Sequence, residues 1–210
     1  MLMTTEFEPI IRRLLPALAY VLASLRAGCD QNPQSRSGQT TVEPAEPDWQ
    51  TQIRAVQAGK SDEIRVSTAQ IGDAEIAALD GLANLKSLTL GDTSITDAGA
   101  AGLASLVKLQ QLRIAGSQIG DEGLTRLAGL PKLELLRLGS PRVTDVALAA
   151  VGKMTQLRFL ILRTPQVTDA GLVHLAGLKQ LESLYVEGTS VTDAGIARLH
   201  EKLPTLHIHW

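Results

Sequence analysis

Residues 157–180 read "LRFLILRTPQVTDAGLVHLAGLKQ", and this stretch decides the fold. Its first half places Leu160 and Leu162 two residues apart, as in a β-strand that buries one face. Its second half, "GLVHLAGL", has apolar residues three and four apart, which is the spacing of an amphipathic helix. A strand and a helix within twenty-four residues cannot bury both apolar faces against each other alone. Neighbouring copies of the same unit have to complete the core.

The sequence supplies such copies at a period of twenty-four residues. Rows of the pattern begin at Ser61, where the copy is weaker, and at Leu85, Leu109, Leu133, Leu157 and Leu181. The tail "TLHIHW" starts a further strand, in which we expect Leu206, Ile208 and Trp210 to point inward and close the array. A regular period of this length is typical of a solenoid.

The shared pattern, "L-x-x-L-x-L…[IV]-T-D-A-G-L-x-x-L-A-x-L", resembles the leucine-rich repeat family over residues 61–210. It is most similar to the repeats found beside F-box domains and in bacterial exported proteins. The resemblance implies an α/β solenoid, a right-handed superhelix with parallel strands on the concave face and helices on the convex face. Residues 48–60 precede the array and predict a capping helix, with Asp48 as N-cap and Gly59 as its end.

The N-terminus predicts export. Arg12 and Arg13 precede the apolar run Leu14–Leu25, which as a helix rises about 18 Å, too little to cross a hydrocarbon core of about 30 Å. We therefore interpret residues 1–28 as a signal peptide. The segment "LRAGC" resembles a bacterial lipobox, which implies lipidation of Cys29; ordinary cleavage near Ala27 and an uncleaved anchor are the alternatives. Residues 29–47 are poor in aliphatic side chains and predict a disordered tether.

One column of the repeat is an aspartate in every row: Asp73, Asp97, Asp121, Asp145, Asp169 and Asp193. Each stands where the helical half begins, so we expect these carboxylates to accept hydrogen bonds from unpaired amides at helix N-termini. A ladder of calcium ligands is the alternative interpretation. The glycines two residues further on, such as Gly99 and Gly123, are expected to let adjacent helices approach closely.

Composition and motifs argue against several classes of function. A net charge of −2 provides no basic field for nucleic acid. The single cysteine, Cys29, excludes a cysteine-based zinc cluster. No phosphate loop or nucleophile elbow is present, so we expect neither an enzyme nor a bound cofactor or metal. His207 and His209 share one face of the last strand and are interpreted as solvated residues, with a surface metal site as the alternative.

Alternation turns the third, fifth and seventh positions of each row toward the concave face. In the C-terminal half, this face collects apolar side chains bordered by arginine: Leu135, Phe159, Ile161 and Tyr185, with Arg113, Arg137 and Arg163 around them. An exposed apolar cluster with a polar rim is typical of a binding site for a protein or peptide partner. Docking of the chain's own linker and self-association are alternatives, and the oligomeric state is not indicated by the sequence.

These observations together predict a non-catalytic protein-interaction module in a bacterial cell envelope. Its location would be the periplasm or a membrane to which the N-terminal lipid or signal holds it. Two other functions stay open. One is binding of envelope polysaccharide, for which Phe159 and Tyr185 would be the aromatic platforms. The other is a cytosolic adaptor, if the N-terminus is not a signal.

Overall fold

The structure, a computed structural model, describes residues 48–67 and 70–210. The described residues belong to one compact unit, Pro44–Trp210. The predicted signal peptide, the predicted lipidation site at Cys29 and the whole of the predicted tether therefore lie outside the described residues.

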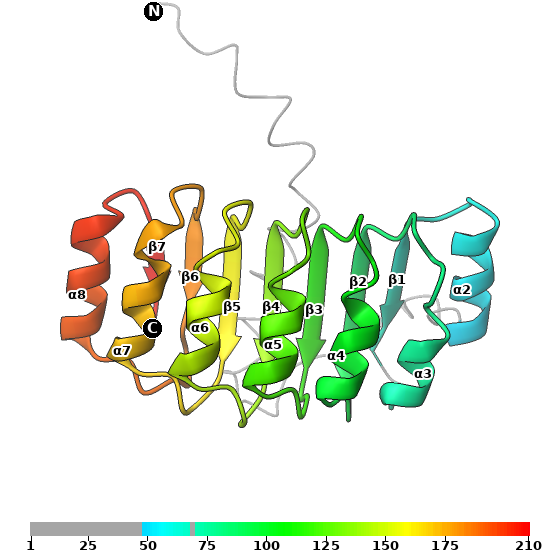
Figure 1. Cartoon of the computed structure of the whole chain (residues 1–210), viewed down its shortest axis with the longest axis horizontal. Helices are drawn as coiled ribbons and strands as arrows, with labels where there is room; N and C mark the ends of the chain where they lie inside the picture. The colour runs from blue at the N-terminus through cyan, green and yellow to red at the C-terminus, as the bar shows by residue number, and fades with distance from the viewer. Residues whose placement is uncertain (1–47, 68–69) are drawn as a thin grey trace, which may run out of the picture. The chain divides into compact units, whose positions relative to one another are not determined.

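The repeat rows form one sheet of seven parallel strands, arranged in the order of the sequence (Figure 1). The strands are β1 (Glu63–Val66), β2 (Ser87–Asp92), β3 (Gln111–Ala115), β4 (Leu135–Gly139), β5 (Phe159–Arg163), β6 (Ser183–Tyr185) and β7 (His207–His209). Each strand pairs with the next one along the chain, as consecutive turns of a solenoid do. The predicted α/β leucine-rich repeat solenoid is confirmed.

The helices cover one face of this sheet and leave the other face without helices (Figure 1). They are α2 (Trp49–Gln57), α3 (Asp73–Ala77), α4 (Asp97–Leu103), α5 (Asp121–Leu127), α6 (Asp145–Val151), α7 (Asp169–Leu172), continued by the 3-10 helix η2 (Val173–Gly177), and α8 (Asp193–Lys202). Helix α2 has Asp48 as its N-cap, and Gly59, at φ 68°, ends the segment in the left-handed region that favours glycine.

The core lies between the sheet and the helices and is entirely aliphatic apart from Met154. The fourth position of each row is fully buried, at 0% exposure in Leu88, Leu112, Leu136, Leu160 and Leu184. The strand register pairs these leucines with one another across the sheet. The inward set of the repeat is therefore the one that its alternation predicts, and the third and fifth positions face the other way.

The aspartate column links each turn to the next. Asp73 lies at the start of α3, yet its Oδ1 accepts from the backbone N–H groups of Thr96 and Gly99, at 2.8 and 3.0 Å, where α4 begins. Its Oδ2 accepts from the Thr96 hydroxyl at 2.6 Å. The corresponding bonds run from the starts of α5, α6, α7 and α8 to Asp97, Asp121, Asp145 and Asp169. The carboxylates thus accept from helix N-termini, but from those of the following turn and not of their own.

The two ends of this column differ from its middle. Helix α3 has no preceding aspartate of the column, and the Gly72 N–H is instead bonded by Glu75 of the same helix at 2.9 Å. At the other end, Asp193 accepts from the indole Nε1 of Trp210 at 2.8 Å. At each end of the array, a side chain without a counterpart in the middle turns supplies the missing hydrogen-bond partner: Glu75 for the start of α3, and Trp210 for Asp193.

Trp210 does not point inward, contrary to the prediction from alternation. Leu206 is buried at 3% exposure, Ile208 is half-buried, and Trp210 is 60% exposed. The sequence pattern puts Trp210 on the buried side, but no strand among the described residues follows β7 to cover it. Its ring lies instead where the indole N–H reaches Asp193. The closing residue of the array is therefore held by a polar contact.

The glycines of the helix starts make room for the preceding aspartate. A Cβ built on Gly99, Gly123, Gly171 or Gly195 would overlap the Oδ1 atom of the aspartate one turn earlier. On Gly123 the same Cβ would also come within 2.9 Å of Ile119 and 3.0 Å of Ala100. Close approach in this column is therefore between a helix backbone and a carboxylate.

Candidate functional site

The predicted partner-binding residues lie side by side on the concave face, by which we mean the face of the sheet turned away from the helices. The β4–β5 register sets Leu135 beside Phe159 and also sets Arg137 beside Ile161. On the other side of β5, Tyr185 pairs with Ile161. Because adjacent strands are about 4.8 Å apart, these side chains form one continuous surface.

Exposure within this surface is lower than the sequence suggests. Leu135 is 4% exposed and Ile161 is 8% exposed, so both are buried, whereas Phe159 and Tyr185 are half-buried. The expectation of four exposed apolar side chains is therefore wrong for the two aliphatic ones. Leu135 lies in register between Gln111 and Phe159, and Ile161 lies between Arg137 and Tyr185, and side chains paired in this way on one face of a sheet are close enough to touch. The accessible apolar part of the face consists of the two aromatic rings.

Tyr185 is held by a contact that sequence reasoning did not identify. Its ring stacks on His209 of β7, with centroids 4.1 Å apart and planes 6° from parallel. Burial, and next the negative charge of Glu187, raise the pKa of Tyr185 above its ordinary value. The sequence did contain a clue to this contact: His209 occupies the fifth position of the last row, as Tyr185 does in the row before, and equal positions in consecutive rows lie side by side.

The ring of Phe159 is contacted by the residue that precedes it, Arg158. The guanidinium of Arg158 lies 5.6 Å from the centroid of the Phe159 ring, within range of a cation–π contact. Arg158 in turn donates to Glu182 through Nε at 2.8 Å. An aromatic ring placed this way is pre-organised for contact, since little side-chain freedom is left to lose on binding.

The three arginines form a positive stretch across the middle of the concave face. The residues of β3, β4 and β5 include Arg113, Arg137 and Arg163 but no aspartate or glutamate. Arg113 donates to the amide of Gln111 at 3.0 Å. Arg163 lies 3.8 Å from Glu187, which follows β6. The positive charge here contrasts with the net charge of −2 of the whole chain.

A hollow of about 380 Å³ opens at the carboxyl ends of β3–β5. Arg137 and Arg163 are its charged lining residues, and no carboxylate lines it. Gly116 and Gly139 lie in the lining, where larger side chains would fill the space. The volume is at the lower end of the roughly 300–1,000 Å³ of small-molecule sites.

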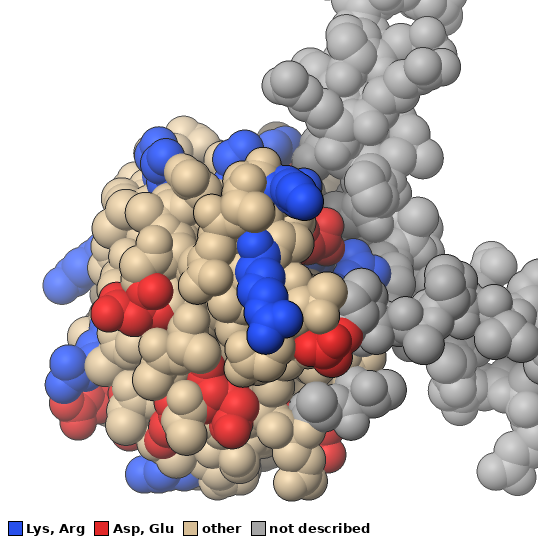
Figure 2. All heavy atoms as spheres, turned by 90° about the vertical axis from the view of Figure 1, so that its right-hand side faces the viewer, with Lys and Arg blue, Asp and Glu red and all other residues tan. Residues whose placement is uncertain are grey.

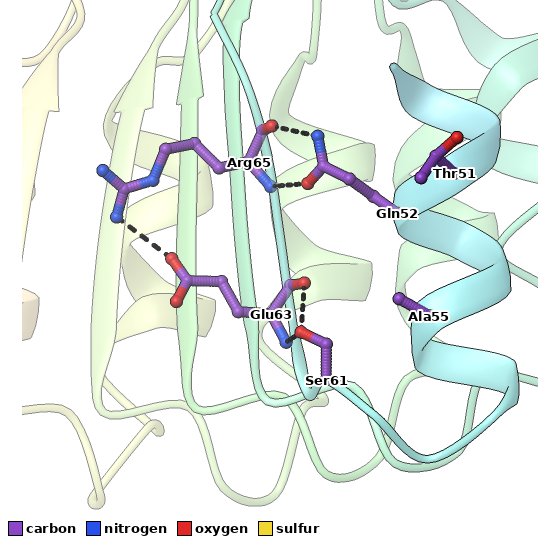
Figure 3. A pocket seen from close by; sticks show the side chains of 6 residues that line it. All are labelled: Thr51, Gln52, Ala55, Ser61, Glu63 and Arg65. Carbon is purple, nitrogen blue, oxygen red and sulfur yellow. Dashed lines mark hydrogen bonds and ion pairs between the residues drawn. The ribbon is translucent and has the colours of Figure 1, made fainter. Parts of the chain in front are cut away.

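A second hollow, of about 370 Å³, lies where α2 meets β1 (Figure 3). Here the Gln52 side chain bonds to the backbone of Arg65, accepting from its N–H at 2.7 Å and donating to its C=O at 2.6 Å. Gln52 thus occupies hydrogen-bonding groups that a neighbouring strand would use. Glu63 pairs with the Arg65 guanidinium at 3.0 Å. The hollow is explained by closure of a sheet edge, which an unpaired strand requires.

The α2 end of the array carries charges of both signs scattered among uncharged side chains (Figure 2). Such a mixed surface is typical of a solvated end cap. It does not offer the single-sign charge that β3–β5 present on the concave face.

Among residues 48–67 and 70–210, no three His, Cys, Asp or Glu side chains are grouped to hold a metal ion, so neither the calcium ladder nor a site at His207 and His209 gains support. No helix of residues 48–67 and 70–210 has the length and apolar character needed to cross a membrane.

Comparison with known proteins identifies the repeat. Residues 81–104 and 105–128 match the family model described as "Leucine Rich repeat". Residues 81–128 are therefore leucine-rich repeats, and the seven-stranded sheet continues the same unit as a leucine-rich repeat fold. No significant match was found among curated protein sequences.

Two of the solved structures with a similar fold come from bacteria. An internalin of Listeria monocytogenes superposes with a TM-score of 0.56 and is 23% identical over 75% of this chain. A leucine-rich repeat protein of Leptospira interrogans gives a TM-score of 0.52 and is 19% identical, also over 75% of this chain. The match covers 49% of the internalin and 39% of the second protein, so this chain spans half of their length or less. At this identity the likeness concerns the fold.

Proposed function

We propose that this protein is a non-catalytic protein-interaction module that binds a partner on the C-terminal half of its concave face. The observation that carries the proposal is the pair of half-buried aromatic rings, Phe159 and Tyr185, on adjacent strands of that face. Aromatic residues make up only 3% of the chain. Aromatic and arginine side chains are also those that most often dominate binding energy at protein interfaces.

The arrangement provides the parts of such an interface. Leu135 is buried beside Phe159 and Ile161 is buried beside Tyr185, and Arg113, Arg137 and Arg163 lie on the same three strands or the strand next to them. The rings are held by Arg158 and His209, so the surface is formed before a partner arrives. Leucine-rich repeat domains in general serve as binding modules, which agrees with this assignment.

The test is capture from bacterial envelope extract with full-length protein as bait. A Phe159→Glu, Tyr185→Ala double variant should lose a specific protein that the wild type captures. The matched control is Ser87→Glu, Thr89→Ala, which changes the same two repeat positions on β2. Equal melting temperatures establish that all three baits are folded. Identical captures by all three would contradict a partner site at the aromatic rings.

We further propose that the protein is exported and held at a bacterial envelope by its N-terminus. The support is in the sequence: Arg12 and Arg13, the apolar run Leu14–Leu25, and the segment that ends at Cys29. Cell fractionation and the mass of the mature N-terminus test this proposal. A mature chain that starts at a lipid-modified Cys29 would support it, and a full-length unmodified chain in the cytosol would contradict it.

A further inference from the structure

The lysines of the chain are gathered along one edge of the solenoid. Each of them lies in a connection that leads from a helix to the next strand, or in the last turn of α8. All seven are exposed: Lys60, Lys86, Lys108, Lys132, Lys153, Lys179 and Lys202. In Figure 1 these connections form the upper edge of the array, where helices end and strands begin. We call it the lysine edge, and six steps of about 4.8 Å between turns make it roughly 29 Å long.

The opposite edge, where strands end and helices begin, carries the opposite charge. The six aspartates of the repeat column are the first residues of α3 to α8, and all the lysines lie on the other edge. The net charge of −2 therefore conceals a separation of charge between two edges of the array. A charged surface of one sign attracts a partner of the other sign even when the whole molecule is nearly neutral.

The lysine edge keeps an excess of positive charge. Its bases are the seven lysines and Arg158, and its carboxylates are Asp62, Asp80, Glu134, Glu182 and Glu201. Asp62 pairs with Lys86 at 2.9 Å, and Arg158 lies 4.0 Å from Glu134 and 2.5 Å from Glu182. In the part of the chain that the structure describes, the other six lysines form no ion pair.

Helix dipoles do not account for this placement. A cation gains from the negative end of a helix only within about the last turn. Lys108 and Lys132 lie five residues beyond the last residues of α4 and α5. They also hold equal positions in consecutive rows, so that two like charges lie on neighbouring turns. The Lys108 ammonium donates to the uncharged amide of Asn84 at 2.8 Å. An anionic surface would relieve the repulsion that remains.

Exposed apolar side chains lie beside these two lysines. Val107 precedes Lys108 and is 51% exposed, which makes it one of four exposed large hydrophobic side chains among the described residues. Pro131, at the same repeat position, precedes Lys132 and is exposed as well. Basic residues together with exposed apolar side chains are typical of surfaces that lie at the interface of an anionic membrane.

We infer that the lysine edge docks on a membrane surface of anionic phospholipid, with the ammonium groups among the headgroups and Val107 at the same depth. The inference rests on the proposed attachment of the N-terminus to an envelope membrane. The predicted tether, residues 29–47, would span about 25 Å as a flexible chain and so keep the edge within reach of that membrane. A solenoid that stands on this edge leaves Phe159 and Tyr185 on its concave face open to a partner.

The experiment measures binding of the full-length protein to vesicles of phosphatidylglycerol and phosphatidylcholine in equal parts, and to vesicles of phosphatidylcholine alone. We expect tighter binding to the anionic vesicles, weakened by salt. A Lys132→Gln, Lys153→Gln double variant should bind them roughly 25-fold less tightly, since each lysine near an anionic surface contributes about fivefold. Val107→Ser, which keeps every charge, should bind about threefold less tightly.

The matched control is the Arg142→Gln, Arg198→Gln double variant. It removes the same charge from the opposite edge, where Arg142 lies between β4 and α6 and Arg198 pairs with Asp169 at 2.9 Å. This control should bind the anionic vesicles as the wild type does. A cooperative melting transition above the assay temperature establishes that each variant is folded. The apolar N-terminal run is the same in all of them, so its own affinity for lipid cancels in the comparison.

Several outcomes would overturn the inference. Equal binding to both kinds of vesicle, full binding by Lys132→Gln, Lys153→Gln, or equal losses in the two double variants would exclude docking through the lysine edge. Soluble polyphosphate bound as tightly as the vesicles, with the same dependence on the two lysines and none on Val107, would assign the edge to a linear polyanion.

Failure of this inference is distinguishable from failure of the proposed function. A lipid-modified Cys29, with vesicle binding that ignores Lys132 and Lys153, keeps the envelope attachment and removes docking through the lysine edge. An unmodified cytosolic chain whose vesicle binding depends on both lysines removes the export proposal and keeps the edge. Capture that depends on Phe159 and Tyr185 tests the partner site independently of both.

Discussion

Replacing Asp73 by alanine should destabilise α4 more than α3, the helix in which Asp73 lies. The carboxylate accepts three hydrogen bonds from the start of α4, two from backbone N–H groups and one from the Thr96 hydroxyl. Loss of one N-cap acceptor costs about 0.5–2 kcal/mol. Because three donors lose an ionised acceptor at once, we expect about 2 kcal/mol for Asp73→Ala.

The matched control is Asp193→Ala, which changes the same residue at the same repeat position. Asp193 is exposed, and its side chain accepts one hydrogen bond within residues 48–67 and 70–210, from the Trp210 indole, so its loss should cost about 1 kcal/mol or less. For a chain of this size, 1 kcal/mol shifts the melting temperature by about 2–4 °C. Asp73→Ala should therefore melt about 4–8 °C below the wild type.

Two measurements decide the matter. Urea denaturation gives the free energy of unfolding for each variant, and hydrogen exchange reports the protection of each helix. We expect Asp73→Ala to lower the protection of amides at the start of α4 while those of α3 keep theirs. Equal destabilisation by the two variants, or lost protection confined to α3, would refute capping from one turn to the next.

Three further predictions concern the core, the glycine column and acid stability. Leu160→Ala should cost about 2–5 kcal/mol in urea denaturation, since Leu160 is fully buried; little change would contradict the strand register. Gly123→Ala should lower stability by about 1–2 kcal/mol, because its Cβ displaces the Asp97 carboxylate and this outweighs the roughly 1 kcal/mol gained in helix propensity; a more stable variant would contradict the close approach. The Thr192 N–H and hydroxyl, and then Arg198, hold the pKa of Asp169 below its ordinary value of 3.8. Its contribution is thus present above that pH and lost as pH falls through the lowered pKa, so Thr192→Ala should weaken the acid dependence of the urea midpoint between pH ~5 and ~2; an unchanged dependence would contradict this role.

The repeat itself was the most predictable feature. A period of twenty-four residues with Leu at fixed places determines which side chains face inward, and the register pairs Leu136 with Leu160 as expected. Parity also predicts which residues share the concave face, and the pairing of Ile161 with Tyr185 confirms their adjacency. Short-range periodicity is sufficient for these features because every turn repeats the same local geometry.

Features that depend on a neighbouring turn were harder to predict. The column shows where Asp73 lies, but not that its side chain reaches forward to α4. Alternation shows that Ile161 and Tyr185 face the same way, but not that Ile161 is buried and Tyr185 half-buried. It also turns Trp210 inward, where only a further strand would have covered it. The hollow beside Arg163 depends on backbone arrangement across three strands and has no signature in any single row.

The forward reach of the aspartates gives the array a direction. A turn deleted from the C-terminal end leaves every remaining helix start with its carboxylate acceptor, and exposes one carboxylate to water, which solvates it readily. A turn deleted from the N-terminal end removes the acceptor of the helix that follows, as α3 illustrates with its own Glu75 as a replacement. Such a chain tolerates lengthening and shortening at its C-terminal end better than at its beginning, so gene duplication has an easier route to longer arrays at that end.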